Sequence, residues 1–244
     1  MILRIPALLS LTLIFHIEKA FTQSTPEDSI LRRSAYQHTA VFYYEQLGDQ
    51  TVLNNGSRYE KYPRPFRLGS AYFLTDQFTT GSVVYDGISF DSVSLLFDEL
   101  QQLLVLRKDG YDLQLVSERI SAFTISGHAF LRLSAGSAHP GLPGTRFYEV
   151  LYSGPSRILK LTDKTIQEEA FLTEGIPKYM VTRDDYYMKW GKVYVQVNSK
   201  DRLLELLKDH KKEIRRFIEK NQLGWEDKEI LLVRVAGYYD QLVK

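Results

Sequence analysis

Residues 79–116, "TTGSVVYDGISFDSVSLLFDELQQLLVLRKDGYDLQLV", contain two Asp-Gly pairs, which begin at Asp86 and Asp109. Aromatic and β-branched residues flank both pairs, and two-residue hairpin loops with positive φ at their centre favour Asp-Gly in that setting. A calcium loop of the EF-hand type needs carboxylates at alternating positions and a later glutamate, a spacing that this stretch lacks. We therefore predict that both pairs are turns of β-hairpins, with a further reversal over residues 98–102.

The same pattern of turn residues extends over residues 51–198, where Gly, Pro, Asn and Asp separate short β-type runs. Strands joined by such short turns are mostly antiparallel, because a parallel neighbour needs a crossover of about a dozen residues or more. Tyr111, Leu113 and Leu115 also alternate with polar residues, as in a strand with one buried face. The pattern predicts a long antiparallel β-meander that forms a twisted sheet or a partly closed barrel.

Helices are predicted on both sides of this meander. Residues 28–46 follow a proline and begin with acidic residues, which suit the first helical turn. Residues 199–242 begin after a capping Asn198 or Ser199 and carry apolar residues at helical spacing. A break at Gly224 divides this second region into a helical pair. The predicted fold class is therefore α+β, with a single domain over residues 23–244.

The first residues have the layout of a secretory signal peptide. A positive Arg4 precedes an apolar run over residues 5–15, and small residues before residue 23 suit a cleavage site. The run is too short for a membrane anchor, which needs about 20 apolar residues. We predict that residues 1–22 are a signal peptide, that no transmembrane span remains after its removal, and that the exported protein is periplasmic or associated with the outer membrane or surface.

Charge and cysteine content narrow the class of function. The chain has 31 basic and 30 acidic residues, and without residues 1–22 each number becomes 29. This balance gives no electrostatic basis for binding nucleic acid, so no nucleic-acid partner is expected. The chain has no cysteine, so it has neither disulfides nor a thiol nucleophile, and a folded domain must be stabilised by its core.

No group of titratable residues in the sequence matches a catalytic or metal-binding motif. The histidines lack zincin spacing, and no Gly-x-Ser-x-Gly motif is present. Two adjacent aspartates would face opposite sides of a strand, and we interpret them as a solvated turn. We therefore predict no catalytic residue, no cofactor-binding residue, no metal ligand and no cofactor. The titratable residues to which we assign no such role are His38, His128, His139, His210, Asp184 and Asp185.

Two further features have ordinary structural explanations. Residues 208–220 contain six basic and three acidic residues, and their apolar side is typical of a solvated amphipathic helix rather than a grip on phosphate or membrane. The chain also has 16 tyrosines and 13 phenylalanines. These rings can provide stacking platforms for sugars, although β-sheets also use aromatic residues for packing.

The order of several segments resembles a family of uncharacterised secreted proteins from Gram-negative bacteria. The segments include "GSVVYDGISFDSVSLLFDELQQLLVL" (81–106), "FYEVLYSGPSRILKL" (147–161), "LLKDHKKEIRRFIEKNQL" (206–223) and "AGYYDQL" (236–242). The resemblance extends from about residue 28 onward and supports export. It implies no activity and no site residue, because that family has no assigned activity. Within "RDDYYMKWGK" (183–192) the turn between the two strands is weakly marked, which leaves the register of this hairpin open.

These observations favour a non-catalytic secreted cell-envelope protein that binds a protein, glycan or lipid partner. Two alternatives stay open. The first is a secreted hydrolase that acts on a polymer with acids from separate strands, which would require His128 or Asp185 to converge with other acids in a cleft. The second is a carrier that encloses an apolar ligand within a curled sheet, which would require an unfilled interior.

Overall fold

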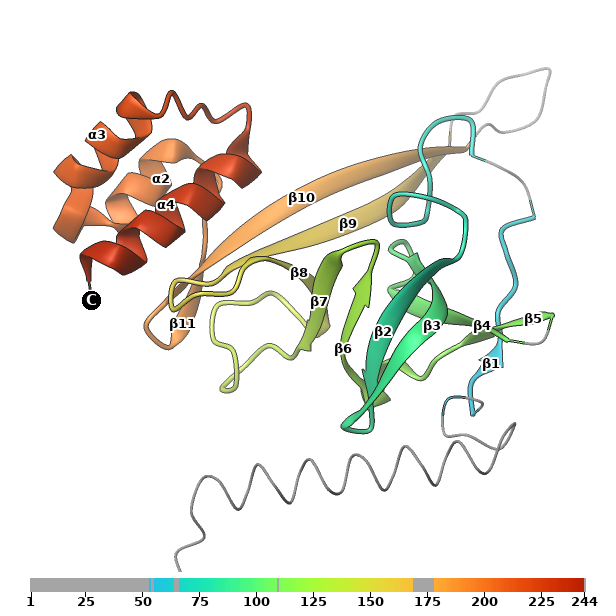
Figure 1. Ribbon diagram of the computed structural model, residues 1–244. Coiled ribbons are helices and arrows are strands. Elements are labelled where there is room, and N and C mark those ends of the chain that lie inside the picture. Colours follow the sequence, from blue (N-terminus) through green and yellow to red (C-terminus); the bar gives the residue numbers. More distant parts are fainter. Residues whose placement is uncertain (1–52, 54, 64–65, 109, 169–177, 244) are drawn as a thin grey trace, which may run out of the picture.

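The computed structural model describes residues 53, 55–63, 66–108, 110–168 and 178–243. Within these ranges the chain forms one antiparallel sheet of 11 strands, followed by three α-helices near the C-terminus (Figure 1). The helices are α2 (Lys200–Leu206), α3 (Lys211–Lys220) and α4 (Lys228–Leu242), with short 3-10 turns η3 (Ser117–Arg119) and η4 (Lys208–His210). The strands are β1 (Ser57–Arg58), β2 (Thr79–Tyr85), β3 (Ile88–Asp98), β4 (Leu103–Lys108), β5 (Tyr111–Gln114), β6 (Ile120–Ile125), β7 (His128–Leu133), β8 (Arg146–Tyr152), β9 (Ile158–Glu168), β10 (Lys178–Trp190) and β11 (Val193–Gln196).

The predicted fold class is wrong. The structure is mostly a large antiparallel sheet, and three short helices replace the predicted C-terminal pair. Residues 28–46, for which a helix was predicted, lie outside the described residues, so no N-terminal helix is supported. The predicted signal peptide, residues 1–22, lies outside them as well.

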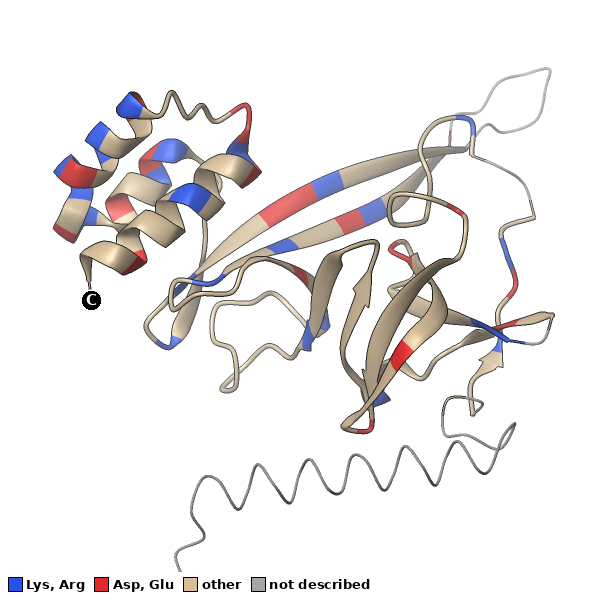
Figure 2. Ribbon diagram, in the orientation of Figure 1, with Lys and Arg blue, Asp and Glu red and all other residues tan. Residues whose placement is uncertain are grey.

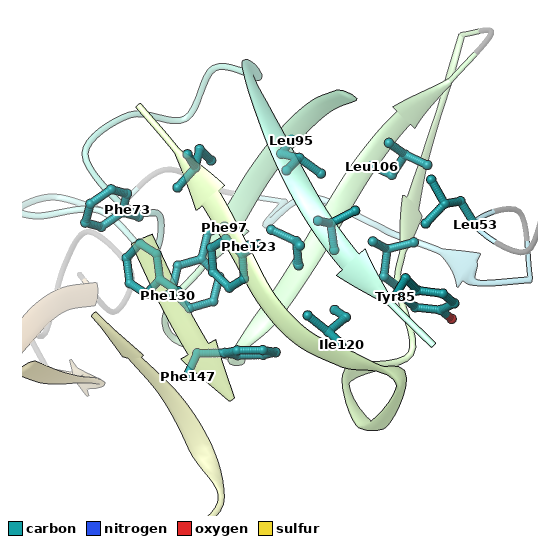
Figure 3. Packing of buried hydrophobic residues seen from close by; sticks show 14 residues of the cluster. Leu53, Phe73, Tyr85, Leu95, Phe97, Leu106, Ile120, Phe123, Phe130 and Phe147 are labelled. Carbon is teal, nitrogen blue, oxygen red and sulfur yellow. The ribbon is translucent and has the colours of Figure 1, made fainter. Parts of the chain in front are cut away.

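The sheet is also not one continuous meander. Its spatial order is β1-β5-β4-β3-β2-β6-β7-β8-β9-β10-β11, so three strands separate β5 from β6. Neighbouring strands lie about 4.8 Å apart, which would place these two strands about 19 Å apart in a flat sheet. The link between Gln114 and Ile120 is too short for that distance, because most of it forms the compact turn η3. The N-terminal half of the sheet therefore curls (Figure 3).

The predicted hairpin turns are confirmed where the structure describes them. Asp86 and Gly87 have φ of 50° and 77°, and they connect the paired residues Tyr85 and Ile88. Asp109 lies outside the described residues. Lys108 and Tyr111, the residues on either side of positions 109 and 110, pair with each other, as the predicted hairpin requires. The reversal over residues 98–102 connects β3 to β4 as predicted. The Asp86 carboxylate accepts hydrogen bonds from the Arg119 guanidinium and so attaches its turn to η3.

The curled half of the sheet encloses an apolar core rich in phenylalanine (Figure 3). The rings of Phe123 and Phe130 stack with centroids 4.7 Å apart, and Phe97 contacts both rings edge to face. Such aromatic pairs stabilise a core beyond the burial of their area. The buried members of this cluster are Leu53, Phe73, Val83, Tyr85, Leu95, Phe97, Leu104, Leu106, Leu115, Ile120, Phe123, Ile125, Phe130 and Phe147.

A second core lies at the other end of the sheet, where α4 packs against β8 and β9 and buried residues of all three helices cluster with residues of β9 and β10 (Figure 1). The helical region divides at Leu207, which has φ −94° and ψ 35°. The apolar spacing of residues 203–218 is compatible with a single helix, so the sequence did not indicate this division. The Tyr239 hydroxyl of α4 donates a 2.8 Å hydrogen bond to Asp209 within η4. No helix in the described ranges is long and apolar enough to cross a bilayer.

The predicted N-cap of the first C-terminal helix is confirmed at Ser199, whose hydroxyl accepts a 3.1 Å hydrogen bond from the Arg202 N–H. We expect Ser199→Ala to lower the free energy of unfolding by about 1 kcal/mol, because an N–H at the helix start loses its partner. Urea unfolding measures this change. Ser199→Asp should retain wild-type stability, and a loss in Ser199→Asp equal to that in the alanine variant would contradict this explanation.

Candidate functional site

The segment between β1 and β2 crosses over the turn that connects β3 to β4. Its described residues, 59–63 and 66–78, contain no named strand, yet backbone hydrogen bonds fix the segment at several points. The Phe73 N–H donates to the Phe97 carbonyl, and the Glu99 N–H donates to the Ala71 carbonyl, each over 2.9 Å. The Met180 N–H of β10 donates to the Leu68 carbonyl over 2.9 Å. This irregular segment therefore has a defined position above the sheet.

Asp98 lies at the centre of a hydrogen-bond network beneath this segment. Its side chain is fully buried, and its Oδ2 accepts 2.8 Å hydrogen bonds from the hydroxyls of Tyr59 and Tyr62. Its Oδ1 accepts from the Gln101 N–H at 3.0 Å. The burial cost of this carboxylate is thus offset by several donors. Asp98 fixes the orientation of both tyrosine side chains.

The two tyrosine hydroxyls are hydrogen-bond donors rather than potential bases. Burial is the main cause that raises the pKa of Tyr59 above its ordinary value, and hydrogen bonds to Tyr72 and Asp98 raise it further. Burial also raises the pKa of Tyr62, and the Asp98 carboxylate adds to this effect. Both tyrosine hydroxyls therefore stay protonated at neutral pH and act as hydrogen-bond donors to Asp98.

A pocket of about 560 Å³ opens beside this network. Its aromatic lining consists of Tyr62, Phe66 and Tyr72. The ring centroid of Tyr62 lies 5.3 Å from that of Phe66 and 6.0 Å from that of Tyr72, and both ring pairs pack edge to face. Lys61 and Asp76 contribute charged groups to the lining. We refer to this site as the aromatic pocket. Aromatic walls with a few polar groups are typical of sites for small organic ligands.

A second polar cluster lies on the sheet between the two cores. Glu149 is buried, and its Oε1 lies 2.6 Å from His128 Nδ1. Lys160 Nζ lies 2.9 Å from Glu229 Oε1, 3.6 Å from Glu149 Oε2 and 3.9 Å from Asp184 Oδ2. His128 thus meets one acid from another strand, Glu149, which is part of what the hydrolase alternative requires. No hydroxyl nucleophile in the described ranges lies within hydrogen-bonding distance of His128.

The charges of this cluster compensate one another. Burial acts against the charged form of Lys160, but the hydrogen bond to Glu229 and the charges of Asp184 and Glu149 outweigh burial and raise its pKa. Burial likewise opposes ionisation of Glu229, but Lys160 and the Tyr186 hydroxyl outweigh it and lower the pKa of Glu229. Since Glu229 lies in the first turn of α4, the cluster joins this helix to the sheet. Its geometry is that of a partly exposed ion-pair network, because Glu149 is buried whereas the Glu229 side chain is 44% exposed.

The other residues considered in the sequence have structural roles. His139 lies in the loop after β7 and its Nδ1 lies 3.0 Å from the Ser134 carbonyl oxygen, while the His210 ring packs edge to face on Tyr239. Asp184 and Asp185 lie within β10, so their interpretation as a turn is wrong. They do face opposite sides, because Asp184 accepts from Thr162 and Asp185 from Gln196. His38 lies outside the described residues.

Residues 208–220, which form η4 and α3, have the expected amphipathic character with a solvated charged side. Ile214 and Ile218 of α3 are buried, while its lysines and arginines are exposed, and Figure 2 shows basic and acidic residues alternating along this helix.

The interior of the curled sheet is occupied, because Phe97, Phe123 and Phe130 pack against one another there. This packing argues against a carrier that encloses an apolar ligand.

Sequence reasoning missed the acids that the structure brings to the candidate site. Asp98 and Glu99 were assigned only to a turn, yet both are buried and bonded to distant side chains. Their position between two apolar runs was the available signal, since acidic residues are seldom buried without partners. Comparison with known proteins adds no further assignment, because no family model, curated protein or solved structure matches this chain.

Proposed function

We propose that this protein is a non-catalytic cell-envelope protein that binds a glycan in the aromatic pocket. The observation that carries the proposal is the combination of aromatic walls with tyrosine side chains held by the buried Asp98. A fixed ring loses little conformational freedom when a ligand packs against it, so affinity is gained through pre-organisation.

The chemistry of a sugar suits this lining. A pyranose ring has an apolar C–H face, which packs on aromatic rings, and a rim of hydroxyl groups, which needs hydrogen-bond partners. Tyr62, Phe66 and Tyr72 supply the rings, while Lys61 and Asp76 supply polar groups. The volume of about 560 Å³ lies within the range of 300–1,000 Å³ that is common for ligand sites.

Binding without catalysis is supported by the carboxylates near the pocket, because Asp76 is the one acid among its described lining residues. Glycoside hydrolysis needs one acid that donates a proton to the leaving group and a second that attacks the sugar or activates water. Asp98 is buried and its oxygens are occupied by Tyr59, Tyr62 and Gln101. A carboxylate so engaged is poorly suited to either task.

The proposed location rests on the sequence. Arg4 and the apolar run over residues 5–15 are typical of a signal peptide, which directs a protein to export. We propose a periplasmic or surface-associated protein. Immunoblotting of periplasmic and membrane fractions tests this location separately from glycan binding.

The binding proposal is tested by titrating the protein calorimetrically with a panel of oligosaccharides prepared from cell-wall and storage polysaccharides. We expect Tyr62→Ala and Phe66→Ala each to weaken the binding of the best ligand by about tenfold or more, which corresponds to about 1.4 kcal/mol. Phe217→Ala is the matched control, since Phe217 is also a half-buried aromatic residue but lies on α3. It should retain wild-type affinity.

Two results would contradict the proposal. One is that the wild-type protein binds no member of the panel, and the other is that all three alanine variants bind equally well. The same mixtures, analysed by chromatography after prolonged incubation, distinguish binding from hydrolysis. We expect the oligosaccharides to be recovered intact, whereas shortened products would favour the hydrolase alternative.

A further inference from the structure

The strands β8 and β9 separate partway along their length. Their pairing includes Glu149 with Lys160, but no pair is formed beyond that point. Both strands nevertheless continue, β8 back to Arg146 and β9 forward to Glu168. Figure 1 shows the long hairpin of β9 and β10 extending well past β8. The sheet therefore has an internal opening between two neighbouring strands.

The backbone of β9 presents an unpaired edge to this opening. The Lys189 N–H of β10 donates to the Arg157 carbonyl, which sets the alternation of hydrogen bonds along this hairpin. The backbone N–H and C=O groups of the odd-numbered residues of β9 consequently bond to β10. Those of the even-numbered residues are directed to the other side of β9. Among the described residues, no hydrogen bond reaches the N–H or C=O groups of Thr162, Lys164 and Ile166 on that side.

The opposite edge of the opening is already closed. The Gln102 side chain accepts a 3.1 Å hydrogen bond from the Phe147 N–H of β8, where a paired β9 would otherwise have bonded. Any added strand would thus pair with β9 alone. A pocket of about 420 Å³ lies here, and its lining includes Gln102, Arg146, Asp163 and Thr165.

Among the described residues that line the pocket, one cation has no acidic partner. Lys164 pairs with Glu99 at 2.8 Å, and Arg183 pairs with Asp185 at 3.0 Å. Arg146 is exposed and makes no ion pair with any residue that the structure describes. The guanidinium group of arginine is well matched to a carboxylate, which it binds with two parallel hydrogen bonds.

We propose that the edge of β9 between Thr162 and Ile166 binds an extended peptide segment of a partner protein as an added strand, with a peptide carboxylate on Arg146. In strand addition, main-chain hydrogen bonds supply affinity and side-chain contacts supply specificity. The three open residues of β9 provide three donors and three acceptors, and Arg146 sets the preference for an acidic or C-terminal group. This peptide site is separate from the aromatic pocket.

The experiment uses a phage library that displays short random peptides with free C-termini, selected on the full-length protein. We expect enriched peptides to carry a carboxylate at or near the C-terminus. Hydrogen exchange measured with a synthetic enriched peptide then locates the contact. Exchange at the amides of Thr162, Lys164 and Ile166 should slow by about tenfold or more on binding. The amides of Asp163 and Thr165, which already bond to β10, should change little.

Variants separate the proposed contact from general charge attraction. Arg146→Gln should weaken peptide binding by about tenfold, whereas Arg215→Gln, which removes an exposed arginine from α3, should leave it unchanged. A peptide with N-methyl groups on the amides that face β9 should not bind. The proposal is overturned if no peptide is enriched, if enriched peptides protect other amides instead, or if the N-methylated peptide binds as well as its parent.

Discussion

Replacing Lys164 with methionine is expected to lower the free energy of unfolding by about 3–5 kcal/mol at neutral pH, because it leaves a buried charge without its partner. The Lys164 ammonium lies 2.8 Å from Glu99 Oε2, and both side chains are less than a tenth exposed. Lys164 also donates hydrogen bonds to the carbonyls of Ser70 and Tyr72. The variant therefore loses the contacts that join β9 to the β3–β4 turn and to the segment between β1 and β2.

The loss should depend on pH. Burial raises the pKa of Glu99 even in the wild type, and Lys164 opposes this shift, so Lys164→Met should raise that pKa further. A group whose pKa is higher in the folded state contributes stability that is complete below its unfolded pKa, about 4.3 for glutamate, and is lost as the pH rises through the folded value. The variant should thus be closest to wild type near pH 4. Urea unfolding from about pH 4 to pH 8 measures the difference.

Two controls accompany this measurement. Lys189→Met removes a lysine of β10 that makes no ion pair with the described residues, and it should change stability by less than about 0.5 kcal/mol. The double variant Glu99→Leu with Lys164→Met should recover much of the loss, since no buried charge stays unpaired. A pH-independent loss in Lys164→Met, or no recovery in the double variant, would show that packing rather than charge explains the effect.

Phe97→Ala is expected to cost about 3–5 kcal/mol, because it leaves a cavity in the centre of the phenylalanine core. Phe97 is almost completely buried, and its ring contacts Phe123, Phe130 and Phe147 with centroids 5.0–5.7 Å apart. The substitution removes the apolar area that the Phe97 side chain buries on folding. It also removes the edge-to-face contacts of Phe97 with the three neighbouring rings. Urea unfolding at neutral pH measures the loss.

Phe97→Leu serves as the comparison, because it retains most of the apolar volume and should cost clearly less than the alanine variant. Glycan affinity provides a second measurement on folded protein. Phe97 does not line the aromatic pocket, so the affinity should stay close to wild type. If Phe97→Ala were as stable as wild type, the interior would be looser than the ring contacts indicate, and the carrier alternative would regain support.

Several features of this fold were predictable because their causes are local. An Asp-Gly pair at a two-residue loop is favoured by the positive φ that the loop requires, and Asp86 and Gly87 adopt that conformation. A serine before a helix satisfies an N–H three residues later, as Ser199 does. The register of the final hairpin was open in the sequence, and the structure sets it by pairing Trp190 with Val193.

The order of strands was not predictable in the same way. A turn shows which strand comes next in the chain, but it does not show which strand lies on the other side. β2 pairs with β6, and β1 pairs with β5, over separations that carry no local signal. The curl that places β6 beside β2 depends on burying the phenylalanine rings from several strands together. Such long-range burial is a property of the whole sheet.

The sequence by itself determined that residues 79–116 reverse direction at Asp-Gly turns, because φ preferences and the alternation of apolar residues act within a few residues. Only the tertiary structure decided what the carboxylates between those turns do. Asp98 meets Tyr59 from 39 residues away and Glu99 meets Lys164 from β9. These partners approach one another only after the sheet has curled, since burying an acid is favourable only where the fold supplies its donors.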